Sequence, residues 1–430
     1  MDAKATSRWC KSVPVRMATD VAVIGGGIAG ACAACAAARE GCRVVLVERF
    51  AVPGGNATVG GVGNWSGETR GQGHTFDRII ASQEQWKAVS PYPGPYRHFS
   101  PTSNRVFDHE ILAIILQELL LEYQVRTLLH TRFVDCRVSE GRISEALICG
   151  QSGLEVFRAK VFIDCSGEGQ VARAAGFSTM KGRAEDNAQL PPSLMFFVRE
   201  TEKHVVPQLP EGWFEPVRSA DDLPMTSVWP NGPGGKAVKL KVTGFDSTDT
   251  VSMSELEMRA RRRAFEVLDY YQRVEARSWR FDHCSPIVGL REGRRIVGDY
   301  VLGVDDVRKG REFADAVARG VFYLDGMSPD DEKRVYLLTK QEQAVPPYHI
   351  PLRCLIARDG ANLLMAGRCF SADQHALSSA RVMPTCAMMG QAAGLTAAIA
   401  VKHGVDPREV DSQEVRKRLE ANGADLRLKQ

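Results

Sequence analysis

Residues 20–48 read DVAVIGGGIAGACAACAAAREGCRVVLVE, and this stretch decides the fold. The apolar run VAVI predicts a buried strand, and the glycines after it predict a tight turn. The alanine-rich run that follows predicts a helix, with Gly41 as a suitable C-cap. Residues 43–48 predict a second strand. A strand, a turn, a helix and a strand in this order predict one β-α-β unit of an α/β fold.

The glycines of this unit have the pattern G-x-G-x-x-G at Gly25, Gly27 and Gly30. The first allows the turn, the second lets backbone approach a pyrophosphate, and the third lets the helix pack on the strand. Glu48 lies eighteen residues after Gly30, at the end of the second strand, where a carboxylate accepts hydrogen bonds from ribose hydroxyls. Glycine triplets also occur in ordinary turns. Here the strand before the glycines, the helix after them and the acid at the expected distance all favour a nucleotide site. We interpret the unit as dinucleotide-binding, and the pattern does not specify the dinucleotide.

The bulk composition is that of a globular protein with a large core. The chain has 430 residues, of which 44% are hydrophobic and 25% charged, enough for about two or three domains. A net charge of +3 gives no reason to expect nucleic acid or an anionic membrane as a partner. The apolar stretches 111–116 and 386–401 are too short or too interrupted to span a bilayer, and indicate buried helices.

The cysteines indicate free thiols. Eleven of them are scattered along the chain, which favours a reducing, cytoplasmic compartment over a disulfide framework. The C-x-x-C pair Cys32 and Cys35 lies among alanines, so we interpret it as small apolar packing. No metal-site spacing occurs, and the basic N-terminus lacks the apolar run of a secretory signal.

Two further segments are rich in glycine. Residues 51–75 directly follow Glu48, so we interpret them as a loop against a ligand rather than a linker. In KVFIDCSGEGQVARAAGF, residues 160–177, an apolar strand ends at Asp164 and a glycine turn leads into a helix. Such junctions mark the edge of a nucleotide or flavin site, although a plain β-turn gives the same pattern.

The rest of the chain divides into two parts that differ in amino-acid composition. Residues 181–345 hold many prolines, tryptophans and a basic helix, and we interpret them as a separate cap or substrate domain. After the cap, a short apolar strand again ends in glycine, NLLMAG at 362–367. A helix of small residues follows at 386–401, and its small side chains predict close packing on the sheet or on a flat ring. Between these units we expect a helix over 108–124, strands over 125–130 and 133–138, and a hairpin over 142–149 and 155–159.

Together these segments resemble the FAD-dependent oxidoreductases of the glutathione-reductase-like superfamily, in the family related to succinate dehydrogenase and fumarate reductase flavoproteins. The motifs that carry the resemblance are GGGIAG at 25–30, Glu48, GGNATVGG at 54–61, FIDCSGEGQVARAAG at 162–176, LREGRRIVGDY at 290–300, YHIPLR at 348–353 and NLLMAGRCFSADQHALSSARVMPTCAMMGQAAG at 362–394. The resemblance implies a Rossmann-like, discontinuous FAD-binding domain of the glutathione-reductase type at 1–180 and 346–430, with an inserted α+β cap at 181–345.

The resemblance also implies an extended FAD, with its adenosine at Glu48 and its flavin ring near the helix that begins at Pro384. A helix N-terminus there stabilises negative charge on the reduced ring. The implied FAD-binding residues are Gly25, Gly27, Ile28, Ala29, Gly30, Glu48, Arg49, Gly54, Gly55, Asn56, Thr58, Asp164, Ser166, Gly167, Gly367, Arg368, Met383, Pro384 and Thr385.

Three differences from other flavoproteins of this superfamily limit the reactions and the modes of cofactor binding that we expect. No cysteine pair follows Glu48, so disulfide reduction is not expected. No histidine occurs between Glu48 and His74, so we expect non-covalent FAD. A second G-x-G-x-x-G unit is absent, so a nicotinamide cofactor has no Rossmann domain of its own.

The candidate substrate groups are mainly arginines and histidines. Arginine forks match carboxylates, which favours a small polar or anionic substrate. The candidates are Arg291, Arg294, Arg295, His349, Arg353, His375 and Arg381, although each arginine also suits a structural ion pair. His375 and Arg381 rank first as catalytic residues because they precede the helix expected to face the flavin, and His375 is the candidate base.

We therefore expect an FAD-dependent dehydrogenase, oxidase or reductase that transfers a hydride between flavin N5 and a small organic substrate. An NAD(P)H-dependent flavin monooxygenase and a flavin-binding subunit that needs a partner for turnover are the alternatives. A glycine turn that binds NAD as a hydride carrier is disfavoured by the glycine loop that follows it. The electron acceptor or donor is unidentified, and a homo-oligomer is compatible with the sequence.

Overall fold

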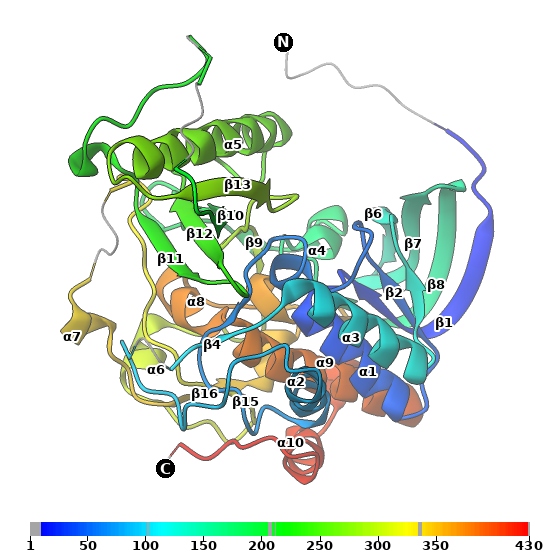
Figure 1. Cartoon of the computed structure of the whole chain (residues 1–430). Coiled ribbons are helices and arrows are strands. Elements are labelled where there is room, and N and C mark those ends of the chain that lie inside the picture. Colours follow the sequence, from blue (N-terminus) through cyan, green and yellow to red (C-terminus); the bar gives the residue numbers. More distant parts are fainter. Residues whose placement is uncertain (1–9, 101–102, 205–208, 211, 334–337, 429–430) are drawn as a thin grey trace.

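A mostly parallel sheet with an antiparallel edge lies at the right of the molecule in Figure 1. The computed structural model describes residues 10–100, 103–204, 209–210, 212–333 and 338–428; residues 1–9 of the basic N-terminus lie outside them. The sheet has the order β5-β2-β1-β8-β7-β6, with β17 also paired to β8. Its strands are β1 (Val15–Ile24), β2 (Val44–Val47), β5 (Arg126–Leu128), β6 (Arg132–Ser139), β7 (Arg142–Gly150), β8 (Gly153–Asp164) and β17 (Leu363–Met365).

The strands of the first unit end together. Ile24 at the end of β1 lies opposite Val47 of β2 and Asp164 of β8, and Asp164 lies opposite Met365 of β17. The carboxyl ends of four parallel strands therefore meet at one edge, where open α/β sheets bind ligands. The predicted strands 155–159 and 160–164 form one strand, β8, whose first half pairs with β7 and whose end pairs with β17.

Two helices of small residues pack closely on each other beside the sheet (Figure 1). They are α1 (Ile28–Arg39) and α9 (Met383–His403). A Cβ on Gly390 would lie 2.1 Å from the carbonyl oxygen of Ala29, and one on Gly394 would lie 2.2 Å from that of Ala33. The predicted close packing on the sheet is confirmed by contacts of α9 with β8, β1 and β17, but Gly390 and Gly394 pack against α1, a partner that the sequence did not indicate.

The register of this contact shows that the two helices run in the same direction. Position 29 meets 390 and position 33 meets 394, so both numbers rise together. The helices therefore begin at the same end of the molecule. Among the described helices, α9 is the one long and apolar enough to cross a membrane, but 94% of its most apolar stretch is buried inside the fold, as expected of a core helix.

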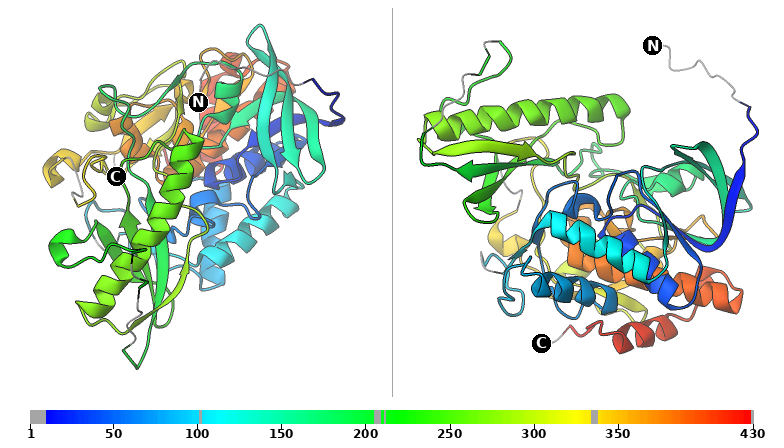
Figure 2. Two further views of the ribbon diagram at one scale, coloured as in Figure 1. Left: turned by 90° about the horizontal axis from the view of Figure 1, so that it is seen from above. Right: turned by 45° about the vertical axis from the view of Figure 1, so that its right-hand side comes forward.

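The cap is an antiparallel sheet covered by one long helix (Figure 2). Its order is β11-β12-β10-β13, with strands β10 (Ser193–Glu200), β11 (Thr226–Pro230), β12 (Gly235–Lys241) and β13 (Trp279–Cys284). The helix is α5 (Thr250–Arg273). In β12 the side chains alternate: Val238 and Leu240 join the core under α5, while Ala237 joins a separate cluster on the opposite face. Lys239 shares that opposite face by the period of two.

The cap is shorter than the sequence predicts. Residues 181–345 were assigned to it, but β14 (Arg295–Ile296) pairs with β9 (Thr179–Met180), and β15 (Ala316–Gly320) pairs with β16 (Tyr348–Pro351). Leu302, Val317 and Val345 lie in the same core cluster as α1 and α9. Near residue 295 the chain thus leaves the cap and rejoins the part of the fold that contains α1 and α9. Pairing with strands far along the chain determines where this segment lies.

The remaining elements connect or cover these layers. The predicted helix over 108–124 is confirmed as α3, whose N-cap Asp108 accepts hydrogen bonds from the backbone N–H groups of Glu110 and Ile111. These elements include α2 (His74–Gln85), α3 (His109–Glu122), α4 (Gln170–Ala174), α6 (Val304–Arg308), α7 (Lys340–Gln343), α8 (Gln374–Ala380), α10 (Ser412–Ala421), β3 (Asn64–Trp65) and β4 (Arg105–Val106).

Candidate active site

One cavity of about 340 Å³ connects the sheet edge with the cap. Residues from the glycine turn, the end of β2 and the start of α9 line one part of it. Residues from β10, β11 and β12 line the other part. A ligand at the sheet edge and a second ligand under the cap would therefore share one space.

The three glycines of the first turn have three different surroundings. Gly25 has φ +100°, and a Cβ there would lie 2.5 Å from the carbonyl oxygen of Cys165. At Gly30 a Cβ would lie 1.8 Å from the carbonyl oxygen of Gly25. A Cβ on Gly27 would meet no protein atom within 4 Å, although Gly27 lines the cavity. Gly25 and Gly30 serve the turn and its packing, and Gly27 leaves room in the cavity.

The N-terminus of α1 faces the part of the cavity next to Gly27. Its N-cap Gly27 has no side chain to accept the first N–H groups, and its first turn carries no acid. Ile28 and Ala29 line the cavity. The uncapped N–H groups and the positive end of the helix dipole make this a suitable place for phosphate oxygens.

Glu48 is fixed at the end of β2. Its side chain is buried, with Oε2 accepting a hydrogen bond of 2.6 Å from the N–H of Gly26 and Oε1 one of 2.9 Å from the N–H of Phe50. Burial raises the pKa of this carboxyl, while the two backbone hydrogen bonds oppose the rise. Each oxygen keeps a second lone pair for a hydroxyl on the cavity side.

Asp164 fixes the backbone of the second glycine turn through hydrogen bonds. This buried carboxylate accepts hydrogen bonds from the backbone and hydroxyl of Ser166 and from the N–H of Val171, and burial raises its pKa. Ser166 and Gly167 line the cavity, whereas Asp164 does not. Next to them, Arg368 pairs with Glu168 at 2.8 Å. In the described part of the chain, Nη1 of Arg368 is buried without a hydrogen-bond partner.

The structure brings most of the predicted FAD-binding residues to this cavity. Those that line it are Gly25, Gly27, Ile28, Ala29, Glu48, Arg49, Gly54, Gly55, Asn56, Ser166, Gly167, Gly367, Arg368 and Met383. Those that lie behind the lining are Gly30, Thr58, Asp164, Pro384 and Thr385. The last set shapes the site: the Thr58 hydroxyl donates to the carbonyl of Pro53 within the glycine loop, and Pro384 stands in the first turn of α9.

Two of the predicted substrate and catalytic residues line the cavity. Arg291 is buried, and its Nη1 donates to the carbonyl of Pro191 at 2.6 Å and to the hydroxyl of Ser193 at 2.7 Å. Arg381 pairs with Asp325 at 2.7 Å, and both side chains are mostly buried. In the described structure, Nε of Arg381 and Oδ1 of Asp325 are buried without a hydrogen-bond partner.

The structure does not bring the other candidates to the cavity. His375 is half-buried on α8 and is not part of the lining. Arg353 pairs with Asp315, Arg294 donates to the carbonyl of Thr248, and Arg295 donates to the carbonyl of Gly182. These arginines fix connections between segments, the structural role that the sequence left open.

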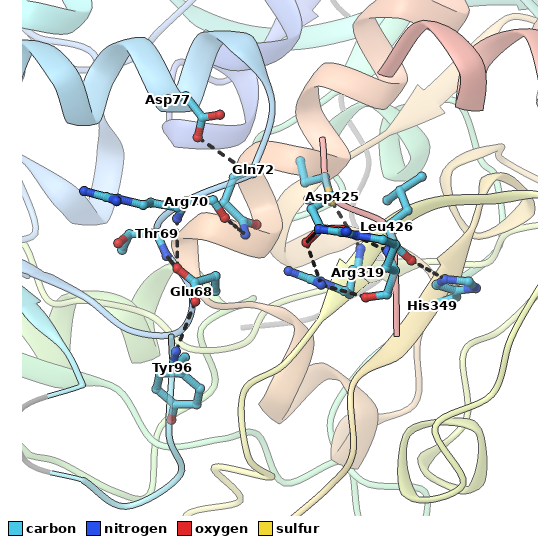
Figure 3. Close-up of polar contacts among 12 residues, drawn as sticks. Glu68, Thr69, Arg70, Gln72, Asp77, Tyr96, Arg319, His349, Asp425 and Leu426 are labelled. Atoms are coloured by element: carbon cyan, nitrogen blue, oxygen red, sulfur yellow. Dashed lines mark hydrogen bonds and ion pairs between the residues drawn. The ribbon is translucent and has the colours of Figure 1, made fainter. Parts of the chain in front are cut away.

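His349 lies in a separate polar network that holds the C-terminal segment (Figure 3). Its Nδ1 accepts from the N–H of Phe313, so Nε2 donates to the carbonyl of Leu426 at 2.7 Å. Burial lowers the pKa of this imidazole, which is therefore neutral. Arg319 in the same network pairs with Asp425 at 3.2 Å. His349 has a structural role here, rather than the predicted contact with substrate.

Sequence reasoning missed Lys239, which lines the cavity from the cap. Burial lowers its pKa to about 8, helped by Arg291 and Arg381 and opposed by Asp325. The missed signal is the period of two in AVKLKV, residues 237–242, which puts lysines on the face opposite the valines and leucine. The apolar walls Met195, Trp229, Phe322, Tyr323 and Met327 were missed as well.

The model of a protein family described as "FAD dependent oxidoreductase" matches residues 20–419. The chain belongs to this family. It is an FAD-dependent oxidoreductase, and FAD is its cofactor. A solved structure of a geranylgeranyl bacteriochlorophyll reductase-like protein from Thermoplasma acidophilum has the same fold, with 13% identity, coverage of 95% of this chain and 85% of that one, and a TM-score of 0.50.

Two more similarities are weaker. The anhydrotetracycline hydroxylase of Streptomyces rimosus is 13% identical, with 95% of this chain and 66% of that chain covered and a TM-score of 0.48. The hydroxyneurosporene desaturase of Rhodobacter capsulatus is 37% identical over 95 residues. This match covers 20% of this chain and 19% of the desaturase, so the chain spans about a fifth of that relative.

The residues of the cavity fit FAD. A flavin adenine dinucleotide needs room for a pyrophosphate at backbone N–H groups, and Gly27 leaves that room at the uncapped start of α1. The buried Glu48 carboxylate offers acceptors for ribose hydroxyls, and the unpartnered Nη1 of Arg368 in the described structure offers a donor to an anion. These groups match the cofactor of the family.

Proposed function

We propose that this oxidoreductase binds FAD in the extended pose of the glutathione-reductase type. Glu48 would hold the adenosine ribose, the turn from Gly25 to Ala29 would hold the pyrophosphate, and Met383 at the start of α9 would contact the flavin. This pose is supported by the cavity lining, which includes Gly25, Gly27, Ile28, Ala29, Glu48 and Met383. FAD is bound without a covalent link, so acid denaturation is expected to release all of the flavin into the supernatant.

We propose that the reaction is hydride transfer between flavin and a small organic substrate under the cap. When bound, FAD supplies the hydride acceptor or donor at its N5. The observation that carries the proposal is the single cavity lined by both the FAD-binding residues and the cap strands. A substrate under the cap and a flavin at the sheet edge would therefore share one continuous space.

The chain's own residues have three tasks in this reaction. The uncapped start of α9 places the positive end of a 21-residue helix at the cavity, where it would stabilise negative charge on a bound flavin. The Arg381–Asp325 pair holds the loop before α9 at the cavity wall. The apolar side chains Met195, Phe322 and Met327 line the space under the cap and would contact an apolar part of the substrate.

The experiment that tests this function begins with an absorbance spectrum of the purified protein. A flavin spectrum, followed by anaerobic bleaching when hydroxy acids, aromatic acids, sugars or amines are added, would support direct hydride transfer. Bleaching only by NADPH, with oxygen then incorporated into a substrate, would support a monooxygenase instead. A flavin that neither a donor nor NADPH reduces would indicate a subunit that needs a partner protein.

The free cysteines are consistent with the proposed reducing, cytoplasmic location. All eleven are unpaired, and Cys32 and Cys35 are buried in α1 with thiol pKa values raised by burial. Their interpretation as apolar packing is confirmed.

A further inference from the structure

The cap-side part of the cavity carries an excess of positive charge. Lys239, Arg291 and Arg381 line it, and Asp325 is the carboxylate beside them. Asp325 is engaged by Arg381 at 2.7 Å. Within the described residues, Lys239 forms no ion pair with a carboxylate and no hydrogen bond. Its ammonium group therefore offers donors to a ligand in the cavity.

Lys239 is placed there by the strand that carries it. Val238 and Leu240 are buried under α5, which turns residue 239 toward the cavity. A lysine half-buried in such a space has lost part of its hydration without gaining a carboxylate partner, and this arrangement costs free energy until an anion binds. The lowered pKa of Lys239, which burial causes, agrees with this description.

The walls around this charge are flat and apolar. Trp229 and Met195 come from the cap, and Phe322, Tyr323 and Met327 come from the segment that follows β15. The rings of Phe322 and Tyr323 stack with centroids 4.3 Å apart. Aromatic and thioether side chains favour a planar, apolar ligand body over a sugar or a polyol.

We propose that the substrate is an organic anion with a planar, apolar body, such as an aromatic or conjugated carboxylate, and that Lys239 binds its anionic group. This inference rests on the proposed function, because it assigns a ligand to the substrate part of the same cavity. It adds a specificity-determining residue, Lys239, and a substrate class. Arg291 and Arg381 assist through their charge, and the aromatic walls hold the body.

The test compares an anion with a neutral molecule of the same shape on the oxidised, FAD-loaded protein. Benzoate and benzamide are titrated at neutral pH, with binding followed by the change in flavin absorbance and by calorimetry. We expect benzoate to bind at least about tenfold more tightly than benzamide, since a desolvated charge pair is worth a tenfold change or more. Acetate, which lacks the planar body, is expected to bind more weakly than benzoate.

The variants separate charge from fold. Lys239→Met is expected to lose the preference for benzoate, and Lys239→Arg to retain it. Lys236→Met is the matched control, because Lys236 lies on the same strand but pairs with Glu200 at 3.3 Å outside the cavity lining. It is expected to bind both probes as the natural chain does. Circular dichroism and FAD content show that each variant is folded and loaded.

The pH dependence gives a second readout. Lys239 faces Arg291, Asp325 and Arg381, and its pKa of about 8 means that its charge is lost as pH rises through this value. Affinity for benzoate should therefore fall above about pH 8 in the natural chain, and this fall should be absent in Lys239→Met. Affinity for benzamide should not follow this profile.

The outcomes distinguish this inference from the function on which it rests. A preparation that never contains flavin would overturn both. A flavin-loaded protein that binds benzoate and benzamide equally, binds neither, or keeps its preference in Lys239→Met would overturn the anion site alone and leave the hydride-transfer proposal standing.

Discussion

Replacing Gly27 by alanine should separate FAD binding from folding. Gly27 has φ −62° and ψ 180°, a conformation that alanine adopts, and the added Cβ would meet no protein atom within 4 Å. The free energy of unfolding of the FAD-free protein should fall by less than about 1 kcal/mol, the range for a changed N-cap residue. The methyl group would project into the space proposed for the pyrophosphate.

The loss of FAD affinity follows from the hydrogen bonds that the methyl group prevents. A hydrogen bond from a backbone N–H to a charged phosphate is worth about 1.5–3 kcal/mol. Losing one or two of them lowers FAD affinity by about 100-fold. Flavin fluorescence titration measures the affinity, and thermal unfolding of the FAD-free protein measures the stability.

Gly30→Ala is the contrasting variant, because its Cβ would lie 1.8 Å from the carbonyl oxygen of Gly25. It should lower the free energy of unfolding by about 3 kcal/mol or more, with or without FAD. If Gly27→Ala bound FAD as tightly as the natural chain, the phosphates would not approach this turn, and the proposed pose would be wrong.

Three other predictions concern packing, charge and pH. Gly390→Ala should destabilise the protein by about 3 kcal/mol, because its Cβ would lie 2.1 Å from the carbonyl oxygen of Ala29; unchanged denaturant unfolding would contradict the close contact of α1 and α9. Arg381→Met should cost about 3 kcal/mol by leaving the mostly buried Asp325 unpaired, and adding Asp325→Asn should recover much of this loss in a double-mutant cycle. Burial raises the pKa of Asp77 to about 6 from a usual value of 3.8, so the folded state binds this proton more tightly than the unfolded state, and the stability that this proton confers is lost as pH rises from about 4 to about 6. Asp77→Asn should therefore be more stable than the natural chain at pH 7 but not at pH 4, as measured by unfolding at both values.

The parts predicted from the sequence are those that local chemistry determines. The turn at Gly25 is local, because its φ of +100° requires glycine and the strand and helix flanking it follow from adjacent residues. The same holds for Asp108, which caps α3 through its own next residues. Such features are fixed within a few positions of the chain.

The parts that the sequence did not predict depend on partners far along the chain. Arg353 and His349 are typical substrate contacts by residue type, but Asp315 and Leu426 engage them in the folded protein. The cap boundary at 345 was wrong for the same reason, since β15 is defined by its pairing with β16. Lys239 was within reach, because the alternation in β12 shows which face it occupies.

The contact between α1 and α9 connects packing with electrostatics. Because Gly390 and Gly394 let the two helices run parallel in close contact, the starts of both helices lie at the same end and both reach one cavity. Neither start has a side-chain cap or an acid in its first turn. Each helix end stabilises a nearby negative charge by about 0.3–1 kcal/mol. A ligand that carries negative charge at two separate places would be stabilised by both helix ends. A flavin dinucleotide is such a ligand, because its pyrophosphate and its reduced ring are both negatively charged. The small residues of α9 therefore matter for the cofactor although most of them never line its cavity.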